Sequence, residues 1–290
     1  MIDVATSRRA GRVLAGLFTF EIIFLWSPIV LLYIFSFNQG TVLAFPFSGF
    51  TLDWYKAIFD SPLLLKSLHT SATIAAAAST ASVIVGLLMS VPLARRKFRG
   101  KAPITALVLS PLVVPHLVFS IALLLLFRFV GDALGIVSIF AWPTVILGHV
   151  VVLLPIIVLI LVPRLQRVDA ALEEAAQDLG ASGFLTFRSI ILPLILPALF
   201  SAYLIAFIIS FNEFIIAVFI SGSATTFPIY VFGQLQYPTE LPVVVATTVI
   251  VVTLSLVVVL GAEFLRRRLE RRIDLLSETT GILGVSDSAT

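Results

Sequence analysis

Six long apolar stretches limit what this chain of 290 residues can fold into. They lie at roughly 13–37, 67–94, 102–128, 141–162, 194–220 and 241–264. Each is long enough for a membrane-crossing helix, which needs about 20 apolar residues, and each lacks the alternation of a membrane β-strand. Only 12% of the residues are charged, about half the share of an ordinary soluble domain. The sequence therefore predicts an all-α membrane protein with six transmembrane helices, and excludes a cytosolic enzyme, a nucleic-acid-binding module and a disordered chain.

Basic residues mark alternate ends of these stretches and predict the topology. Most of the 19 Lys and Arg residues precede the first stretch, separate the second from the third and the fourth from the fifth, or follow the sixth. Because Lys and Arg are retained on the cytoplasmic side of a membrane, both termini are expected to be cytoplasmic. The first stretch follows basic residues as a signal peptide does, but its apolar run is too long and no small-residue cleavage site follows. It is therefore expected to be a retained helix.

The N-terminal region, residues 1–64, is expected to hold the first helix and an outer loop. Within that loop Thr51 is placed to cap a short helix at the membrane surface. Trp54 and Tyr55 on this helix are interpreted as an aromatic anchor in the interface rather than as a ligand site.

Two further regions are expected after it. Residues 65–265 form the transmembrane core, and residues 266–290 form a cytoplasmic tail that is disordered from Ser277 onward. Within the core, residues 221–240 are expected to be a turn-rich outer loop. The turn-forming residues there are Gly222, Pro228 and Pro238.

The loop between the fourth and fifth stretches has the pattern of a short capped helix. Asp169 can cap its start, Glu173 lies in its first turn, and Gly180 can end it in a left-handed conformation. After a turn, a second short helix is expected to lead to Pro193, which opens the fifth span at a position where proline costs no hydrogen bond. Two short helices at an angle on the cytoplasmic face would suit docking into a groove of a partner.

This loop resembles the EAA loop of type I ABC importer permeases. The resemblance rests on Glu174-Ala175-Ala176, on Gly180, and on Ile190-x-Leu192-Pro193 at the family's spacing. In that family the loop forms a coupling helix that inserts into the cytoplasmic ATPase. The resemblance implies the type I ABC importer permease (MetI-like) fold; the competing interpretation is an interfacial helix with no partner. The coupling residues that it implies are Glu173, Glu174, Ala175, Ala176, Asp178, Leu179, Gly180, Ala181 and Ser182.

Shorter motifs resemble the second permease subunit of spermidine/putrescine-type importers. They are Ser36-Phe37-Asn38, Gly49-Phe50-Thr51, the basic run 96–101, Ser110-Pro111 through Pro115, 178–182, Phe211-Asn212-Glu213-Phe214 and Pro228-Ile229-Tyr230. This resemblance implies a multi-pass subunit of a bacterial inner membrane. Its implied partners are a second permease subunit, a cytoplasmic ABC ATPase dimer and an extracytoplasmic solute-binding protein. The implied cargo is a small polar solute, polyamine-like or a related amino-containing compound.

The residues offer no catalytic centre. The chain has no Gly-x-x-x-x-Gly-Lys-[Ser/Thr] phosphate loop and no cysteine, and His69, His116 and His149 lie in three different stretches. The chain is therefore expected to be no enzyme and to bind no cofactor, with ATP and Mg²⁺ held by the partner ATPase. The alternative is a six-span secondary transporter or an integral-membrane enzyme that works without an ATPase.

Glu213 is the main candidate for a solute-path residue, because an ionisable group inside a span is costly to keep there. It follows Pro193 by about 20 residues, or about 30 Å along a helix, which places it in the outer half of the fifth span. Its carboxylate could attract a cationic amine, or it could be a structural carboxylate paired with a neighbouring helix. The other candidates on this path are Phe211, Asn212, His116 and Tyr230.

Two of these candidates depart from the polyamine pattern that the resemblance implies. His116 stands where such permeases often carry an acidic residue, and Asn212 replaces a common Asp. Both changes remove negative charge from the expected path. An opine, a phosphonate or a similar solute therefore stays open as an alternative to a fully cationic polyamine.

Overall fold

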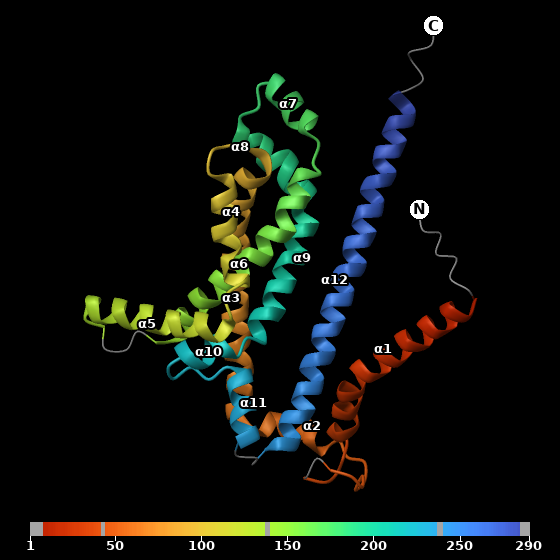
Figure 1. Cartoon of the computed structure of the whole chain (residues 1–290), viewed down its shortest axis with the longest axis vertical. Coiled ribbons are helices and arrows are strands. Elements are labelled where there is room, and N and C mark those ends of the chain that lie inside the picture. Colours follow the sequence, from red (N-terminus) through yellow and green to blue (C-terminus); the bar gives the residue numbers. More distant parts are fainter. Residues whose placement is uncertain (1–7, 42–43, 137–139, 237–239, 285–290) are drawn as a thin grey trace. The chain divides into compact units, whose positions relative to one another are not determined.

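The computed structural model describes residues 8–41, 44–136, 140–236 and 240–284, and these residues are predominantly helical. Among them, six helices are long and apolar enough to cross a membrane, which confirms the predicted all-α fold with six spans. The helices are α1 (Arg8–Ser36), α2 (Asp53–Ala57), α3 (Pro62–Arg95), α4 (Lys101–Leu109), α5 (His116–Leu134), α6 (Trp142–Gln166), α7 (Ala170–Asp178), α8 (Gly183–Thr186), α9 (Leu192–Phe211), α10 (Ile215–Ile220), α11 (Phe227–Gln236) and α12 (Leu241–Gly284). Figure 1 shows their order along the chain.

The chain divides into two compact units. The first combines the residues up to Leu65 with Gly233–Thr253, and the second combines Lys66–Phe232 with the residues from Leu254 onward. Both candidate sites from the sequence fall in the second unit.

Hydrogen bonds from α1 and α2 organise the first unit. The indole Nε1 of Trp54 donates to the carbonyl of Asn38 at 2.8 Å, and the hydroxyls of Tyr55 and Ser36 lie 2.8 Å apart. The short helix α2 is present, but its N-cap is Leu52 and not Thr51 as expected. The Thr51 hydroxyl, one position earlier, accepts the amide N–H of Asp53 at 3.1 Å. A second hydrogen bond, from the Thr51 hydroxyl to the carboxylate, and the nearby Lys56 hold the pKa of Asp53 below its ordinary value. Trp54 and Tyr55 therefore also hold the segment after α1 to the end of that helix.

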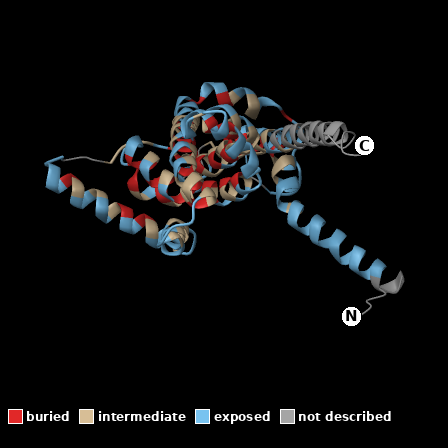
Figure 2. Cartoon of the chain, turned by 90° about the horizontal axis from the view of Figure 1, so that it is seen from above, coloured by how far each residue is buried: buried red, intermediate tan, exposed pale blue. Residues whose placement is uncertain are grey.

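Helix α1 buries almost none of its surface within this chain (Figure 2). Most of its exposed side chains are apolar, including Phe20 and Phe24. Such a surface needs lipid or another subunit around it.

The core of the second unit is packed mainly between α3, α6 and α9. Leu153, Ile157 and Leu161 of α6 are buried against Ile195 and Ala202 of α9. A second buried cluster joins α6 to α5 and α10. These contacts keep the helices around both candidate sites in fixed positions.

Close packing of α3 against α6 depends on Gly86. A Cβ atom at this position would lie 2.4 Å from Cγ2 of the buried Ile157. We expect Gly86→Val to destabilise the protein by about 1–3 kcal/mol through overpacking. Thermal unfolding in detergent measures this, with Gly16→Ala as the control, because no heavy atom lies within 4 Å of that position. Equal melting temperatures for the two variants would contradict this packing.

The third predicted span is wrong in its extent. A continuous helix over 102–128 was expected, but α4 ends at Leu109 and α5 begins only at His116. Pro111 and Pro115 lie in between, and a proline lacks the N–H needed to continue a helix and crowds the preceding turn. Figure 1 shows α5 running crosswise to α4 after this break. The membrane-length helix is His116–Leu134.

The fifth predicted span, 194–220, is also wrong at both ends. The helix starts at Gly183 and continues through a π-helical turn, Phe187–Ile191, into α9. The expected second short helix is therefore the first turn of this long helix, and Pro193 lies inside it, next to the wider turn that accommodates proline. At its other end α9 stops at Phe211, before the short helix α10.

Two loop predictions need correction. The segment 221–240 was expected to be a turn-rich outer loop, but it contains the ten-residue helix α11, with Pro228 in its first turn, where proline is tolerated. Pro238 lies outside the described residues. The predicted disorder from Ser277 is wrong as far as Gly284, because α12 extends to that residue. No proline interrupts this segment, and a helix adds residues at little cost once it has formed.

Candidate functional site

The 169–182 loop has the capped geometry that the sequence predicts. The Asp169 carboxylate accepts the N–H of Ala171 at 3.0 Å at the start of α7. Gly180 ends the helix in the left-handed region, with φ of 84°. The Ser182 hydroxyl then accepts the N–H of Leu185 at 3.3 Å and starts α8. Figure 1 shows α7 and α8 beyond the ends of α4, α6 and α9 in this unit.

Four apolar side chains of this region are exposed, and we call them the loop patch: Leu172, Leu179, Phe184 and Leu185. Leu179 is 90% exposed and Phe184 is 74% exposed. Because they lie at the tip of the unit, neither side chain contributes to its core. Large exposed apolar side chains in one short segment make this loop a candidate surface for a partner.

The adjacent acidic residues of α7 face different surroundings. Glu174 is exposed, as are Ala175 and Asp178, whereas Ala176 is buried. Glu173 points inward and forms an ion pair with Arg95 at the end of α3, with Nη2 and Oε1 2.8 Å apart. From the sequence, Arg95 was only a topology marker, and its partner lies too far along the chain for any local pattern to reveal it.

A pair of ionisable side chains lies where the break between α4 and α5 approaches the break between α9 and α10. His116 begins α5 after the first break, and Glu213 lies in the second break, between α9 and α10. His116 Nδ1 and Glu213 Oε2 are 3.7 Å apart, and the Glu213 side chain is 12% exposed. The other carboxylate oxygen, Oε1, accepts the N–H of Ile216 at 3.1 Å in the first turn of α10. Glu213 therefore has a structural contact through one carboxylate oxygen and faces His116 with the other.

The other predicted path residues surround this break without forming one cluster. The Asn212 side chain donates to the carbonyl of Ile208 at 2.8 Å, so it bonds back to its own helix. The Phe211 ring lies 6.1 Å from that of Phe227 on α11, measured between centroids. Tyr230 is half-buried one turn further along α11. The structure thus joins His116 to Glu213 and connects Phe211 to the helix that carries Tyr230.

A buried polar pair near the same break was missed from the sequence. His149 Nδ1 of α6 and Ser210 Oγ of α9 are 2.7 Å apart, three positions before Glu213. The residues have no local spacing that would suggest contact, since they belong to different spans. Within the described part of the chain, no group of three or more His, Cys, Asp or Glu residues could hold a metal ion.

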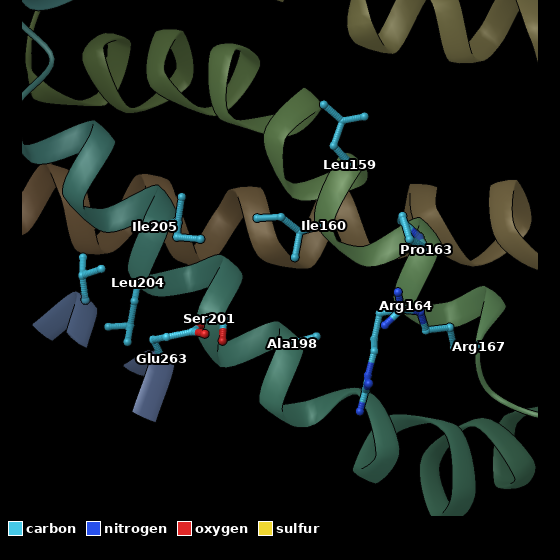
Figure 3. A pocket seen from close by; sticks show the side chains of 11 residues that line it. Leu159, Ile160, Pro163, Arg164, Arg167, Ala198, Ser201, Leu204, Ile205 and Glu263 are labelled. Carbon is cyan, nitrogen blue, oxygen red and sulfur yellow. The ribbon is translucent and has the colours of Figure 1, made fainter. Parts of the chain in front are cut away.

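A cavity of about 400 Å³ lies between α6, α9 and the second half of α12 (Figure 3). Its wall is mainly apolar, with three ionisable residues: Arg164 of α6, Arg167 directly after α6, and Glu263 of α12. Nη2 of Arg164 donates to the Leu194 carbonyl at 3.4 Å. The lining residues include neither His116 nor Glu213, so this cavity is separate from the pair at the helix breaks.

The fold is similar to that of chains in solved ABC transporters. A solved bacterial alginate ABC transporter, in complex with a periplasmic protein bound to an alginate pentasaccharide, superposes with a TM-score of 0.70. That alignment covers 92% of this chain and 96% of the other at 15% identity, so the likeness concerns the fold alone. An amino acid ABC transporter solved with histidines superposes with a TM-score of 0.51 over 77% of this chain and 99% of the other, at 21% identity.

The chain belongs to the family of binding-protein-dependent transport system inner membrane components, whose model matches residues 82–271. The spermidine/putrescine transport system permease protein PotC of Haemophilus influenzae is 35% identical over 84% of this chain and 93% of its own length. The putrescine transport system permease protein PotI of Escherichia coli K12 is 35% identical over 73% of this chain and 76% of its own length. These relatives are permeases, which confirms the resemblance and the assignment to a transport subunit rather than an enzyme. The 169–182 loop, His116 and Glu213 all lie inside the matched region.

Proposed function

We propose that this chain is the membrane-spanning permease of an ATP-driven importer of small cationic amines, coupled through its 169–182 loop to a separate ATPase. The observation that carries the proposal is the capped loop with its exposed loop patch, in a member of a family of binding-protein-dependent transport components. The proposed location is the bacterial inner membrane, with both termini in the cytoplasm, as the distribution of basic residues indicates.

The ATPase is proposed to bind ATP and Mg²⁺ and to cover the loop patch. A patch centred on Leu179 and Phe184 gives the ATPase apolar anchors. Glu174 and Asp178 lie exposed beside it and can pair with basic groups at the rim of the interface. Closure of an ATPase dimer would then move α7, and the permease would alternate between two access states.

The solute is proposed to be an amine of the polyamine type, delivered by an extracytoplasmic binding protein. Two relatives are putrescine or spermidine/putrescine permeases by name. Glu213 supplies a carboxylate at the break between α9 and α10, and its ion-pair partner among the described residues is His116. A second permease subunit would complete the path and cover apolar surface such as that of α1.

The proposal is tested with the complete transporter in proteoliposomes. We expect uptake of radiolabelled putrescine or spermidine that needs ATP, the ATPase and the binding protein, whereas sulfate is not taken up. Uptake that continues without the ATPase would contradict the proposal and favour the secondary transporter. ATP-driven uptake of an anion in place of amines would contradict the proposed solute class.

A further inference from the structure

We propose that Arg95 is a positioning residue for energy coupling, which fastens the coupling helix α7 to the ends of α3 and α6. This inference rests on the proposed function, because it takes the docking of an ATPase on the 169–182 loop as its starting point. Beyond that docking, the inference specifies which contacts transmit a displacement of α7 to the transmembrane helices.

One guanidinium group connects three elements. Arg95 is the last residue of α3. Its Nη2 lies 2.8 Å from Oε1 of Glu173 on α7, and its Nη1 donates to the carbonyl of Val168 at 2.9 Å, in the link between α6 and α7. The planar guanidinium presents its donors in fixed directions from separate nitrogens, so two of them can reach two partners that one lysine ammonium is less well placed to reach.

This ion pair differs from the surface pairs that contribute little to stability. The side chains of Arg95 and Glu173 are only 16% and 23% exposed. Charges shielded from water attract each other more strongly, and removing one partner leaves the other partly buried and uncompensated. The next residue, Arg96, is exposed, as are the basic residues 97 and 99. Arg95 therefore has a function beyond the topology signal of this basic run.

Helices α3 and α6, which Arg95 connects to α7, are closely packed against each other. Gly86 of α3 contacts Ile157 of α6, and the buried residues Leu161 and Leu165 continue this packing toward the end of α6 that carries the loop. Ile195 of α9 belongs to the same cluster. A tightly packed group moves as a body, so a pull on α7 would move α3 and α6 together with α9, which ends at the break holding Glu213.

The two neighbouring glutamates of α7 therefore have separate roles. Glu174 is exposed and available to the ATPase, whereas Glu173 holds α7 to this chain. Loss of the Arg95–Glu173 pair should leave the ATPase bound and active while its movement is transmitted poorly. Loss of the loop patch should instead release the ATPase.

The test compares variants in the assembled transporter, with uptake and ATP hydrolysis measured in the same proteoliposomes. We expect Arg95→Gln and Glu173→Gln each to lower the amount of solute moved per ATP by about tenfold, the middle of the range for residues that carry coupling between sites. ATPase copurification should stay at the wild-type level. Arg95→Lys keeps the positive charge but loses the planar guanidinium group, and should give an intermediate amount of solute moved per ATP. Arg96→Gln, which removes an exposed charge one position away, should leave the ratio unchanged.

A charge swap separates the pair from its individual members. The double variant Arg95→Glu/Glu173→Arg restores the ion pair but not the hydrogen bond to the Val168 carbonyl, because a carboxylate cannot donate one. It should therefore recover part of the transport per ATP that either single variant loses. The inference is overturned if Arg95→Gln keeps the wild-type ratio, or if the swapped pair is no better than either single variant. Failure of the proposed function is a different result, in which the wild-type complex itself shows no ATP-dependent uptake.

Discussion

Leu179→Glu is expected to leave the chain folded in the membrane without its ATPase, and to reduce ATP-driven uptake at least about thirtyfold, the effect of losing an interface hot spot. Leu179 is 90% exposed at the end of α7, so the substitution changes no contact inside the chain's own core. A carboxylate placed in a desolvated apolar interface would be buried without a partner. Copurification of the ATPase with the tagged chain measures the effect.

A matched control tests whether the loss of ATPase is specific to a charge placed in the 169–182 loop. Phe59→Glu also adds a charge at a strongly exposed apolar position, but in the short turn after α2, in the first unit. It should copurify with as much ATPase as the wild type. The account of the loop would be contradicted if Leu179→Glu, alone and combined with Phe184→Glu, retained normal amounts of ATPase.

Glu213→Gln is expected to lower uptake of a cationic amine by at least about tenfold, because a carboxylate a few ångströms from a cation contributes more than 1.4 kcal/mol when it is partly shielded from water. The amide oxygen of Gln can still accept the N–H of Ile216, so the start of α10 should be preserved. The variant therefore removes the charge and keeps the structural contact. Initial uptake rates at equal amounts of assembled complex give the comparison.

Two further variants distinguish a path charge from a merely structural one. His116→Lys places a permanent positive charge beside the carboxylate, now 3.7 Å from the histidine, and should lower amine uptake as well. Asp132→Asn removes an exposed carboxylate at the far end of α5 and should have no effect. Wild-type uptake by Glu213→Gln would show that Glu213 is structural only.

The parts of the fold that depend on local interactions could be predicted from the sequence. Asp169 and Gly180 are examples, because a capping carboxylate and a left-handed glycine act within a few residues of their own position. The number of spans follows from apolar length in the same way. The EAA spacing around Glu174 was informative because several local features coincide in one loop.

The missed features depend on contacts between distant segments. Pro111 and Pro115 could either kink a helix or end it, and packing of α5 against α10 decides in favour of a break. The break at Glu213 contains no proline, and its carboxylate stabilises the start of α10 only once the chain has turned. Helix α11 begins at Phe227, whose N–H is bonded to the hydroxyl of Ser71 on α3. A single sequence contains no signal for such pairs.

Cross-linking from the 169–182 loop tests the central claim most directly. The chain contains no cysteine, so Leu179→Cys introduces a single reactive thiol at an exposed position. In membranes containing the whole transporter, a short thiol-to-amine cross-linker should join Leu179→Cys to the ATPase, whereas Phe59→Cys should not react with it. A cross-link from Phe59→Cys, or none from Leu179→Cys with the transporter assembled and active, would contradict docking of the ATPase on this loop.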